Sequence, residues 1–311
     1  MKKQLYIKSK NVYKANMHCH TTVSDGKYSP EEIKSMYTAK GYSIVAFTDH
    51  RQIKPQAQLN DENFLAINAC ELDINPSGMD DLPRHRRPCY HFNLYASRAD
   101  MSGTPAPLNM DYYDIDALNK YILERTEEGF LVCYNHPYWS IQNHWDYSRL
   151  KNLFAMEIYN NNCETEGAYG YHPQVYDEML RCGNRLFCFA TDDNYNQFPD
   201  DSPASDSFGG FININSKSLV YEDVMAALIK GDFYASQGPE IYEISLEDKI
   251  LNISCSPAKT IVVYTMGRKC YIKHGENMQG ASFELSGDEG YIRIMCRNAD
   301  NKDASSNAFW L

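Results

Sequence analysis

The sequence predicts an α/β fold followed by a small all-β unit, and three observations lead to this. Through about residue 235, short apolar runs alternate with helical stretches, a pattern that favours parallel strands in a doubly wound sheet or a barrel. After about residue 236 the helical pattern stops, and short apolar runs separated by Gly, Asp and Asn are typical of a β-sandwich. Gln237-Gly238-Pro239 marks the boundary, so we expect domains at 1–236 and 237–311.

Each expected element rests on local chemistry. The clearest helix is 29–40, because Ser29 suits the N-cap, Pro30 the first helical position and Glu32 a capping box. Further helices are expected at 114–128, 172–182 and 221–230, each followed or ended by a glycine. Strands are expected at 15–20, 43–48, 64–71, 90–95, 130–134, 154–159, 185–190 and 209–214. In the second domain they are expected at 241–246, 250–254, 260–265, 282–285 and 291–296.

Composition narrows the class of protein. The formal net charge of −11 disfavours a broad nucleic-acid surface, although bound metal ions would still allow an anionic substrate. Ten cysteines without a Cys-x-x-Cys pair indicate reduced thiols, hence a cytoplasmic protein. The start of the chain lacks the apolar run of a signal peptide, and no window is long enough for a membrane span. We therefore expect neither a nucleic-acid nor a membrane partner.

Histidines and carboxylates gather at the ends of the expected strands. In a parallel barrel these ends meet at one mouth, and residues i and i+2 of a strand share a face, so two imidazoles of a His-x-His pair project together. Such a pair alone is as often chance as a ligand pair. Its repetition at successive strand ends predicts a metal cluster, and the residues concerned are His18, His20, Asp25, His50, Glu71, His91, His136 and Asp193.

These motifs resemble the polymerase and histidinol phosphatase (PHP) superfamily. The resemblance lies in residues 17–26 (MHCHTTVSDG), 39–41 (AKG) and 47–50 (FTDH), and later motifs follow in the family's order over about residues 14–235. Residues 231–239 and 256–258 resemble a branch with a small C-terminal β domain. The resemblance implies a distorted (β/α)7 barrel carrying a small β-sandwich.

The resemblance also implies ligand sets for two divalent ions and a third site. Glu71 would bridge the first two ions, which a shared carboxylate holds about 3.5–4 Å apart. Mn, Fe and Zn all suit mixed imidazole and carboxylate ligands. The implied sets are His18, His20, Glu71 and Asp193 for the first ion, Glu71, His91 and His136 for the second, and Asp25 and His50 for the third.

One departure bears on the third site. The family's last motif is Asp-x-His, whereas this chain has Asp193-Asn194-Tyr195, and a phenol is a poor ligand near neutral pH. We therefore expect two ions and only conditional occupancy of a third site. An alternative alignment makes Asp192 the ligand with Asn194 at the His position; we favour Asp193.

Several polar residues remain as candidates for substrate contact. Arg51, Asn160 and Tyr195 are the substrate-binding candidates, and Asn160 equally suits support of the barrel. The basic run Arg84-His85-Arg86-Arg87 is either a solvated loop or a phosphate clamp over the barrel mouth. The remaining histidines, His144, His172 and His274, are interpreted as structural.

The sequence therefore predicts a metal-dependent hydrolase acting on a small phosphorylated substrate, as a phosphomonoesterase or phosphodiesterase. The catalytic candidates are Asp25, His50 and Glu71; His50 or Asp25 would protonate the leaving group if no third ion binds. Two alternatives remain open. One is hydrolysis of an ester or amide at the same centre, and the other is a noncatalytic metal-binding module.

Overall fold

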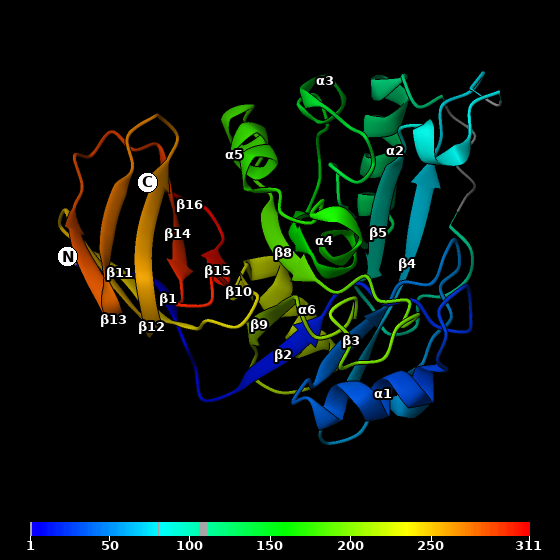
Figure 1. Cartoon of the computed structure of the whole chain (residues 1–311), viewed down its shortest axis with the longest axis horizontal. Coiled ribbons are helices and arrows are strands. Elements are labelled where there is room, and N and C mark those ends of the chain that lie inside the picture. The colour runs from blue at the N-terminus through cyan, green and yellow to red at the C-terminus, as the bar shows by residue number, and fades with distance from the viewer. Residues whose placement is uncertain (1, 80, 106–110) are drawn as a thin grey trace.

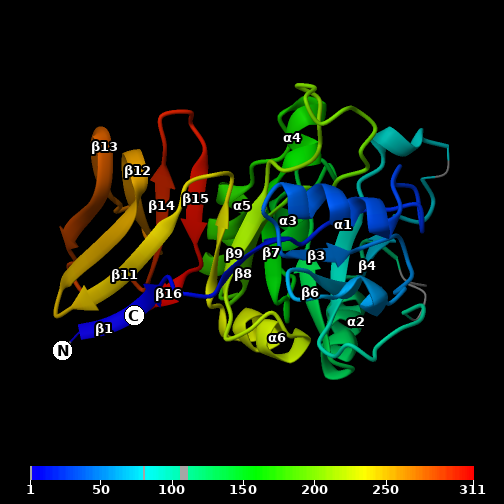
Figure 2. The same cartoon turned by 90° about the horizontal axis from the view of Figure 1, so that it is seen from below.

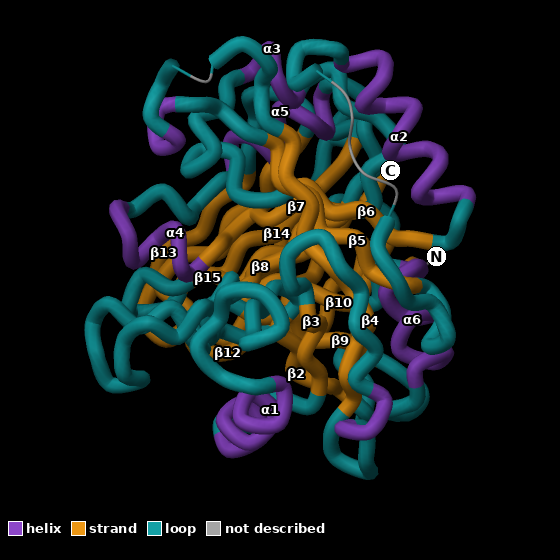
Figure 3. Tube along the Cα trace, turned by 90° about the vertical axis from the view of Figure 1, so that its right-hand side faces the viewer, coloured by secondary structure: helices purple, strands orange, loops and turns teal. Residues whose placement is uncertain are grey.

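The computed structural model describes residues 2–79, 81–105 and 111–311, and it confirms the mixed α/β class (Figure 1). Strands of the first unit form the central layer, with helices and loops around them when the molecule is seen from that end (Figure 3). These strands are β2 (Val12–Asn16), β3 (Ile44–Phe47), β4 (Leu65–Ile74), β5 (Tyr90–Ala96), β6 (Phe130–Tyr134), β7 (Ala155–Asn160), β8 (Phe187–Thr191), β9 (Phe211–Asn215) and β10 (Phe233–Ser236).

The strand directions differ from the all-parallel expectation at β5. Pairs β2/β3, β3/β4, β6/β7 and β7/β8 are parallel, but β5 is antiparallel to both β4 and β6. Apolar runs do not encode strand direction, so this reversal could not be predicted from them. Its consequence is that the start of β5, with His91, lies opposite Asp73 near the end of β4.

Hydrogen bonding leaves the seven strands β2–β8 short of a continuous barrel. Among the described residues, no strand ladder joins β8 to β2. The chain segments that follow these two strands are linked by a single parallel bridge between Cys19 and Asn194. Backbone hydrogen bonds from His20 N to Asn194 O (3.1 Å) and from Asp193 N to His18 O (2.9 Å) accompany it. This link brings the residues that follow β2, the first of the seven strands, next to those that follow β8, the last.

The predicted helices form with small shifts at their ends. They are α1 (Pro30–Ala39), α2 (Ile115–Glu127), α5 (Pro173–Arg181) and α6 (Tyr221–Lys230), joined by the short α3 (His144–Tyr147), α4 (Asn161–Gly167), η1 (Ala57–Leu59) and η2 (Arg84–Arg86). The capping box of α1 is confirmed: Ser29 Oγ accepts from Glu32 N, and Glu32 Oε2 accepts from Ser29 N. α1 therefore begins where the sequence places it, directly after the Asp25 loop.

The C-terminal strands pack around a core of their own (Figure 2). They are β11 (Ile241–Glu247), β12 (Ile250–Thr265), β13 (Tyr271–Glu284), β14 (Tyr291–Arg297), β15 (Asp303–Ser306) and β16 (Phe309–Trp310). The runs 250–254 and 260–265 join into the single irregular strand β12. β13 begins well before residue 282 and pairs with β12. Its largely exposed faces carry no apolar alternation that would reveal it.

Pairing runs continuously between the two units, because β10 is hydrogen-bonded to both β9 and β15. The N-terminal strand β1 (Lys2–Ile7) pairs with β11 and so lies with the C-terminal strands. The predicted boundary at residue 236 and the sandwich form of the second unit stay predictions. Within the described part of the chain, each helix is too short or too polar to cross a bilayer.

Candidate metal centre

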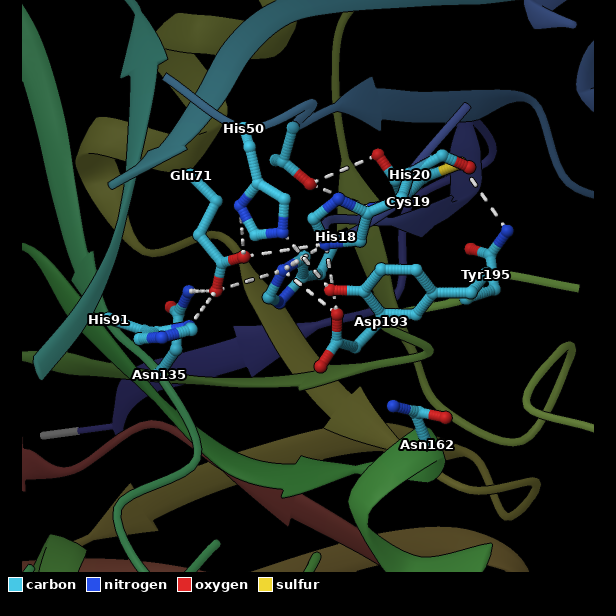
Figure 4. A network of polar contacts seen from close by, with 12 residues as sticks. His18, Cys19, His20, His50, Glu71, His91, Asn135, Asn162, Asp193 and Tyr195 are labelled. Carbon is cyan, nitrogen blue, oxygen red and sulfur yellow. Dashed lines mark hydrogen bonds and ion pairs between the residues drawn. The ribbon is translucent and has the colours of Figure 1, made fainter. Parts of the chain in front are cut away.

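Imidazole and carboxylate groups from distant parts of the chain converge near the C-terminal ends of the parallel strands and the start of β5 (Figure 4). Their ligand atoms fall into three overlapping groups, each with all atoms within 4.8 Å of one another. Every one of the predicted ligands except Asp25 belongs to a group. The groups are His18, His20 and Asp193; His20, His50 and Glu71; and Glu71, His91 and His136.

Glu71 lies at the middle of the cluster. Its side chain is buried, and its two oxygens lie within 3.4 Å of nitrogens from five imidazoles. Oε1 is 2.9 Å from His91 Nδ1 and Oε2 is 3.3 Å from His50 Nδ1, so the two oxygens face different groups. A carboxylate placed in this way can be shared by two cations, which is the bridging position that the resemblance implies for Glu71.

Asp193 closes the opposite side. Its Oδ1 lies 3.1 Å from Nε2 of both His18 and His20. Asp193 adopts a left-handed backbone conformation, with φ of 54°, a region that Asp tolerates better than most residues and that often occurs at functional sites. The turn that follows β8 therefore directs this carboxylate into the cluster.

The adjacent Asp192 points elsewhere, which bears on the choice between the two aspartates. Its carboxylate accepts hydrogen bonds from the backbone N–H groups of 208–210 and from the Tyr37 hydroxyl. Asn194 is likewise engaged with Tyr37 and Asn16, away from the cluster. The geometry thus favours Asp193, with Tyr195 facing the cluster.

Hydrogen bonds behind the cluster fix the histidine rings. His18 Nδ1 is 2.7 Å from Glu157 Oε1, so a proton on Nδ1 leaves a lone pair on Nε2 for the cluster. Glu157 also accepts from Thr191 Oγ1, His136 N and Asn160 Nδ2. His136 Nδ1 contacts Ser140 Oγ at 3.1 Å. The sequence pattern includes Glu157 but gives no sign of this supporting role, nor of Asn135, which donates to Glu71 Oε1 at 3.0 Å.

The substrate-binding candidates occupy three different settings. Asn160 donates to Asp193 Oδ2 at 3.1 Å and accepts from Cys163 N, which makes it a support for Asp193. Arg51 is exposed and forms a bidentate ion pair with Asp73. The Tyr195 ring stacks on His20, with centroids 4.2 Å apart, and its hydroxyl is 3.4 Å from His50 Nε2. Of the three, Tyr195 contacts two of the clustered histidines, His20 through its ring and His50 through its hydroxyl.

Asp25 and His50, the residues implied for a third ion, are more exposed than the other candidate ligands. Asp25 is 55% exposed, with Oδ1 3.7 Å from His20 Nδ1 and Oδ2 3.5 Å from His50 Nε2. Its loop is held from beneath by Asp49, which accepts from Thr21 and Ser24. Asp25 can therefore approach either a third cation or a bound substrate.

Electrostatics favour a charged centre. Burial opposes ionisation, yet the neighbouring histidines His91 and His18 hold the pKa of Glu71 well below its usual range. Burial likewise opposes protonation of His18 and His91, but nearby carboxylates, Asp193 for His18 and Glu71 for both, raise their pKa well above the ordinary value. A cation entering the cluster must displace these protons, while it would replace their charge beside the carboxylates.

The residues fit a divalent-metal centre. Among the described residues, His20 Nδ1, His50 Nδ1 and Glu71 Oε2 are buried polar atoms without a hydrogen bond, a costly arrangement unless another partner binds there. Mixed imidazole and carboxylate donors suit Mn, Fe or Zn. The number and identity of the ions stay predictions.

Gly26 allows the Asp25 loop to close against the His20 backbone. A Cβ built on Gly26 would lie 2.3 Å from the His20 carbonyl oxygen. Any residue other than glycine would therefore force the backbone to shift. We expect Gly26→Ala to displace Asp25 and lower kcat/KM for a hydrolysed substrate by about ten- to a hundredfold. Steady-state kinetics should be compared with Gly267→Ala, where a Cβ meets nothing closer than 3.9 Å. Equal activity of the two variants would contradict this role.

The fold and the site together define an α/β protein with a candidate divalent-metal centre. No family model matches the chain. It is 35% identical over 86 residues to the DNA polymerase/3'-5' exonuclease PolX of Bacillus subtilis (strain 168). That match spans 22% of this chain and only 15% of the relative's length.

A solved structure from Bacteroides vulgatus ATCC 8482 is similar over nearly the whole chain. It is described as a two-domain protein containing a predicted PHP-like metal-dependent phosphoesterase. The likeness covers 99% of this chain and 98% of that one, with 14% sequence identity and a TM-score of 0.48.

Proposed function

We propose that this protein is a metal-dependent phosphoesterase of the PHP type, with β2–β8 as the counterpart of that family's distorted barrel. The observation that carries the proposal is the position of Glu71, whose two oxygens meet five imidazoles, with Asp193 opposite. Metal ions held by these residues would supply an activated water and neutralise charge on the phosphate. Some side chains would bind the metal ions, and others would contact the substrate.

His18, His20 and Asp193 would hold one ion, His91 and His136 another, and Glu71 both. Glu157, Ser140 and Asn160 orient these ligands from behind. In this arrangement each residue that would bind a metal ion is held in place by a hydrogen bond from a neighbour or by burial. The centre is therefore preorganised by the chain before substrate arrives.

Tyr195 and His50 face the exposed side of the cluster. Burial raises the pKa of the Tyr195 phenol well above its ordinary value, so the hydroxyl stays protonated and donates a hydrogen bond to an anionic oxygen. Burial lowers the pKa of His50, so its ring is neutral at pH 7 and suits a ligand better than a proton donor. Asp25 lies exposed beside it, with Oδ2 3.5 Å from His50 Nε2, and is within reach of a third cation or of the substrate.

Metal removal tests the proposal. We expect strong chelation to abolish hydrolysis of 4-nitrophenyl phosphate or bis(4-nitrophenyl) phosphate, and Mn²⁺ to restore it. The measurement is the rate of nitrophenol release before chelation, after it and after metal is added back, with metal content recorded for each sample. Hydrolysis that continues at the same rate in metal-free protein would refute the proposal.

Ester or amide hydrolysis is the second candidate, favoured by Tyr195 at the position where the family has a metal-binding His. A centre with two ions polarises a carbonyl as it does a phosphoryl group. Side-by-side rates on 4-nitrophenyl phosphate and 4-nitrophenyl acetate, with the same metal-loaded protein, distinguish the two.

A further inference from the structure

A large cavity opens directly beside the candidate metal centre. Its volume is about 1020 Å³, and His91, a member of the Glu71 group, forms part of its wall. A cavity of this size exceeds the needs of a phosphate group and matches the range found for drug-sized ligands. Because it shares His91 with the cluster, an ester bound at the centre can extend its remaining part into this cavity.

One side of the cavity is aromatic. Tyr138, Trp139 and Tyr169 line it, and all three side chains are substantially exposed. Trp139 packs edge-on against the metal-ligand candidates His91 and His136, with ring centroids 5.8 and 5.1 Å away. Exposed aromatic rings gathered in a cavity favour a flat apolar ligand.

These rings are fixed in position. The Trp139 indole N–H donates to Glu166 Oε2 at 2.7 Å, and Tyr138 packs edge-to-face with Tyr169 at 5.0 Å. Glu166 also lines the cavity, but the indole occupies one of its oxygens. The aromatic wall is therefore preorganised, and the Glu166 charge lies on that wall.

A different part of the wall is basic. Arg84, His85 and Arg87 line the cavity from η2 and the residue after it. Arg87 Nε donates to the Leu82 carbonyl. For Arg84, by contrast, no side-chain partner is found in the part of the chain that the structure describes. A guanidinium that lines a cavity in this way is suited to a carboxylate or phosphate of a ligand.

We propose that this cavity is the leaving-group subsite, and that the substrate is a phosphate ester whose leaving group carries a planar ring and a second negative charge. The proposal rests on the phosphoesterase function proposed above. The scissile phosphate lies at the Glu71 cluster, the ring lies against Trp139 and Tyr169, and the second anion meets Arg84. This assigns to the basic run at 84–87 the clamp alternative, directed at the leaving group.

Binding of non-hydrolysable phosphonates to the full-length, Mn²⁺-loaded protein tests the subsite without relying on turnover. The probes are methylphosphonate, phenylphosphonate and 4-carboxyphenylphosphonate, titrated by calorimetry in phosphate-free buffer. We expect the ring to tighten binding about tenfold and the carboxylate to tighten it about tenfold more. Equal affinity of the three probes, or binding of none, would overturn the proposal.

Matched variants test which residues account for each increase in phosphonate affinity. Arg84→Gln should remove most of the gain from the carboxylate, whereas Arg86→Gln, on the same 3-10 helix but outside the cavity wall, should retain it. Tyr169→Ala should reduce the gain from the ring, and the exposed Tyr113→Ala, also outside that wall, should not. Loss of the carboxylate gain in both arginine variants, or in neither, would contradict the assignment of Arg84.

Hydrolysis of phenyl phosphate by the same wild-type preparation separates the two proposals. Graded phosphonate affinities without hydrolysis would refute the phosphoesterase function and, with it, the leaving-group assignment, and would leave the cavity only as a binding site for a ring and a second anion. Hydrolysis with equal affinities would refute the subsite alone.

Discussion

Replacing Glu71 with glutamine is expected to lower kcat/KM for a hydrolysed phosphoester by about a thousandfold, or about 4 kcal/mol of transition-state stabilisation. The reason is that the Glu71 carboxylate lies within 3.4 Å of nitrogens from all five clustered imidazoles. Glutamine preserves the size of the side chain but removes the charge that two cations would share. One of its former acceptor atoms becomes an N–H₂ donor facing ligand nitrogens.

Metal content is the measurement that separates this role from a general loss of structure. Purified Glu71→Gln protein should retain less bound metal than wild type after dialysis, while its thermal unfolding stays cooperative. The exposed Glu276→Gln in β13 is the matched control and should keep both metal and activity. A Glu71→Gln protein with wild-type metal content and turnover would show that Glu71 is not a bridging ligand.

Several candidate ligands of the site could be predicted because they follow a recognisable strand end. His18, His20 and His50 lie directly after β2 and β3, and parallel strands bring such positions to one edge. His91 shows where that reasoning was incomplete. It lies near the start of β5, and it reaches the cluster only because β5 runs antiparallel to β4.

The supporting contacts were beyond prediction for a different reason. Glu157 receives hydrogen bonds from residues 136, 160 and 191, and these pairings depend on loop conformations that no periodicity reveals. The same holds for β1, whose partner β11 lies more than two hundred residues away. Long-range pairing of a short polar strand leaves no local signal.

The cavity could not be predicted from the sequence either, because its walls come from separate segments of the chain. The basic run at 84–87 was visible in the sequence, but its neighbours Trp139 and Tyr169 come from segments after β6 and α4. Only the fold places these segments beside His91. A substrate class can be inferred once the basic and aromatic walls are seen to share one cavity.

The second large effect is expected at Arg293, where replacement with methionine should reduce the free energy of unfolding by about 3–5 kcal/mol. The Arg293 side chain is only 2% exposed and forms a bidentate ion pair with Asp177, at 2.6 Å (Nε to Oδ1) and 2.7 Å (Nη2 to Oδ2). Its guanidinium also lies over the Tyr264 ring, 4.0 Å from the centroid. Methionine would leave the Asp177 carboxylate buried without its partner.

Chemical denaturation of three proteins tests this. Arg98→Met removes an exposed ion pair with Asp100 and should change stability by no more than about 0.5 kcal/mol. Adding Asp177→Leu to Arg293→Met should recover much of the loss, because no uncompensated charge then remains buried. A single Arg293→Met variant as stable as Arg98→Met would show that the pair contributes little.

The location of this ion pair connects stability to the metal centre. Arg293 belongs to β14 of the C-terminal unit, whereas Asp177 belongs to α5, which precedes β8 and hence the Asp193 turn. A second link acts on β8 itself, since Asn307 Oδ1 accepts from Cys188 N at 3.0 Å. The C-terminal strands therefore brace the element that delivers Asp193, and Arg293→Met should lower the temperature at which metal is lost together with the unfolding midpoint. If Arg293→Met retained its metal up to the unfolding midpoint of the wild type, the stability of the metal centre would be independent of the C-terminal strands.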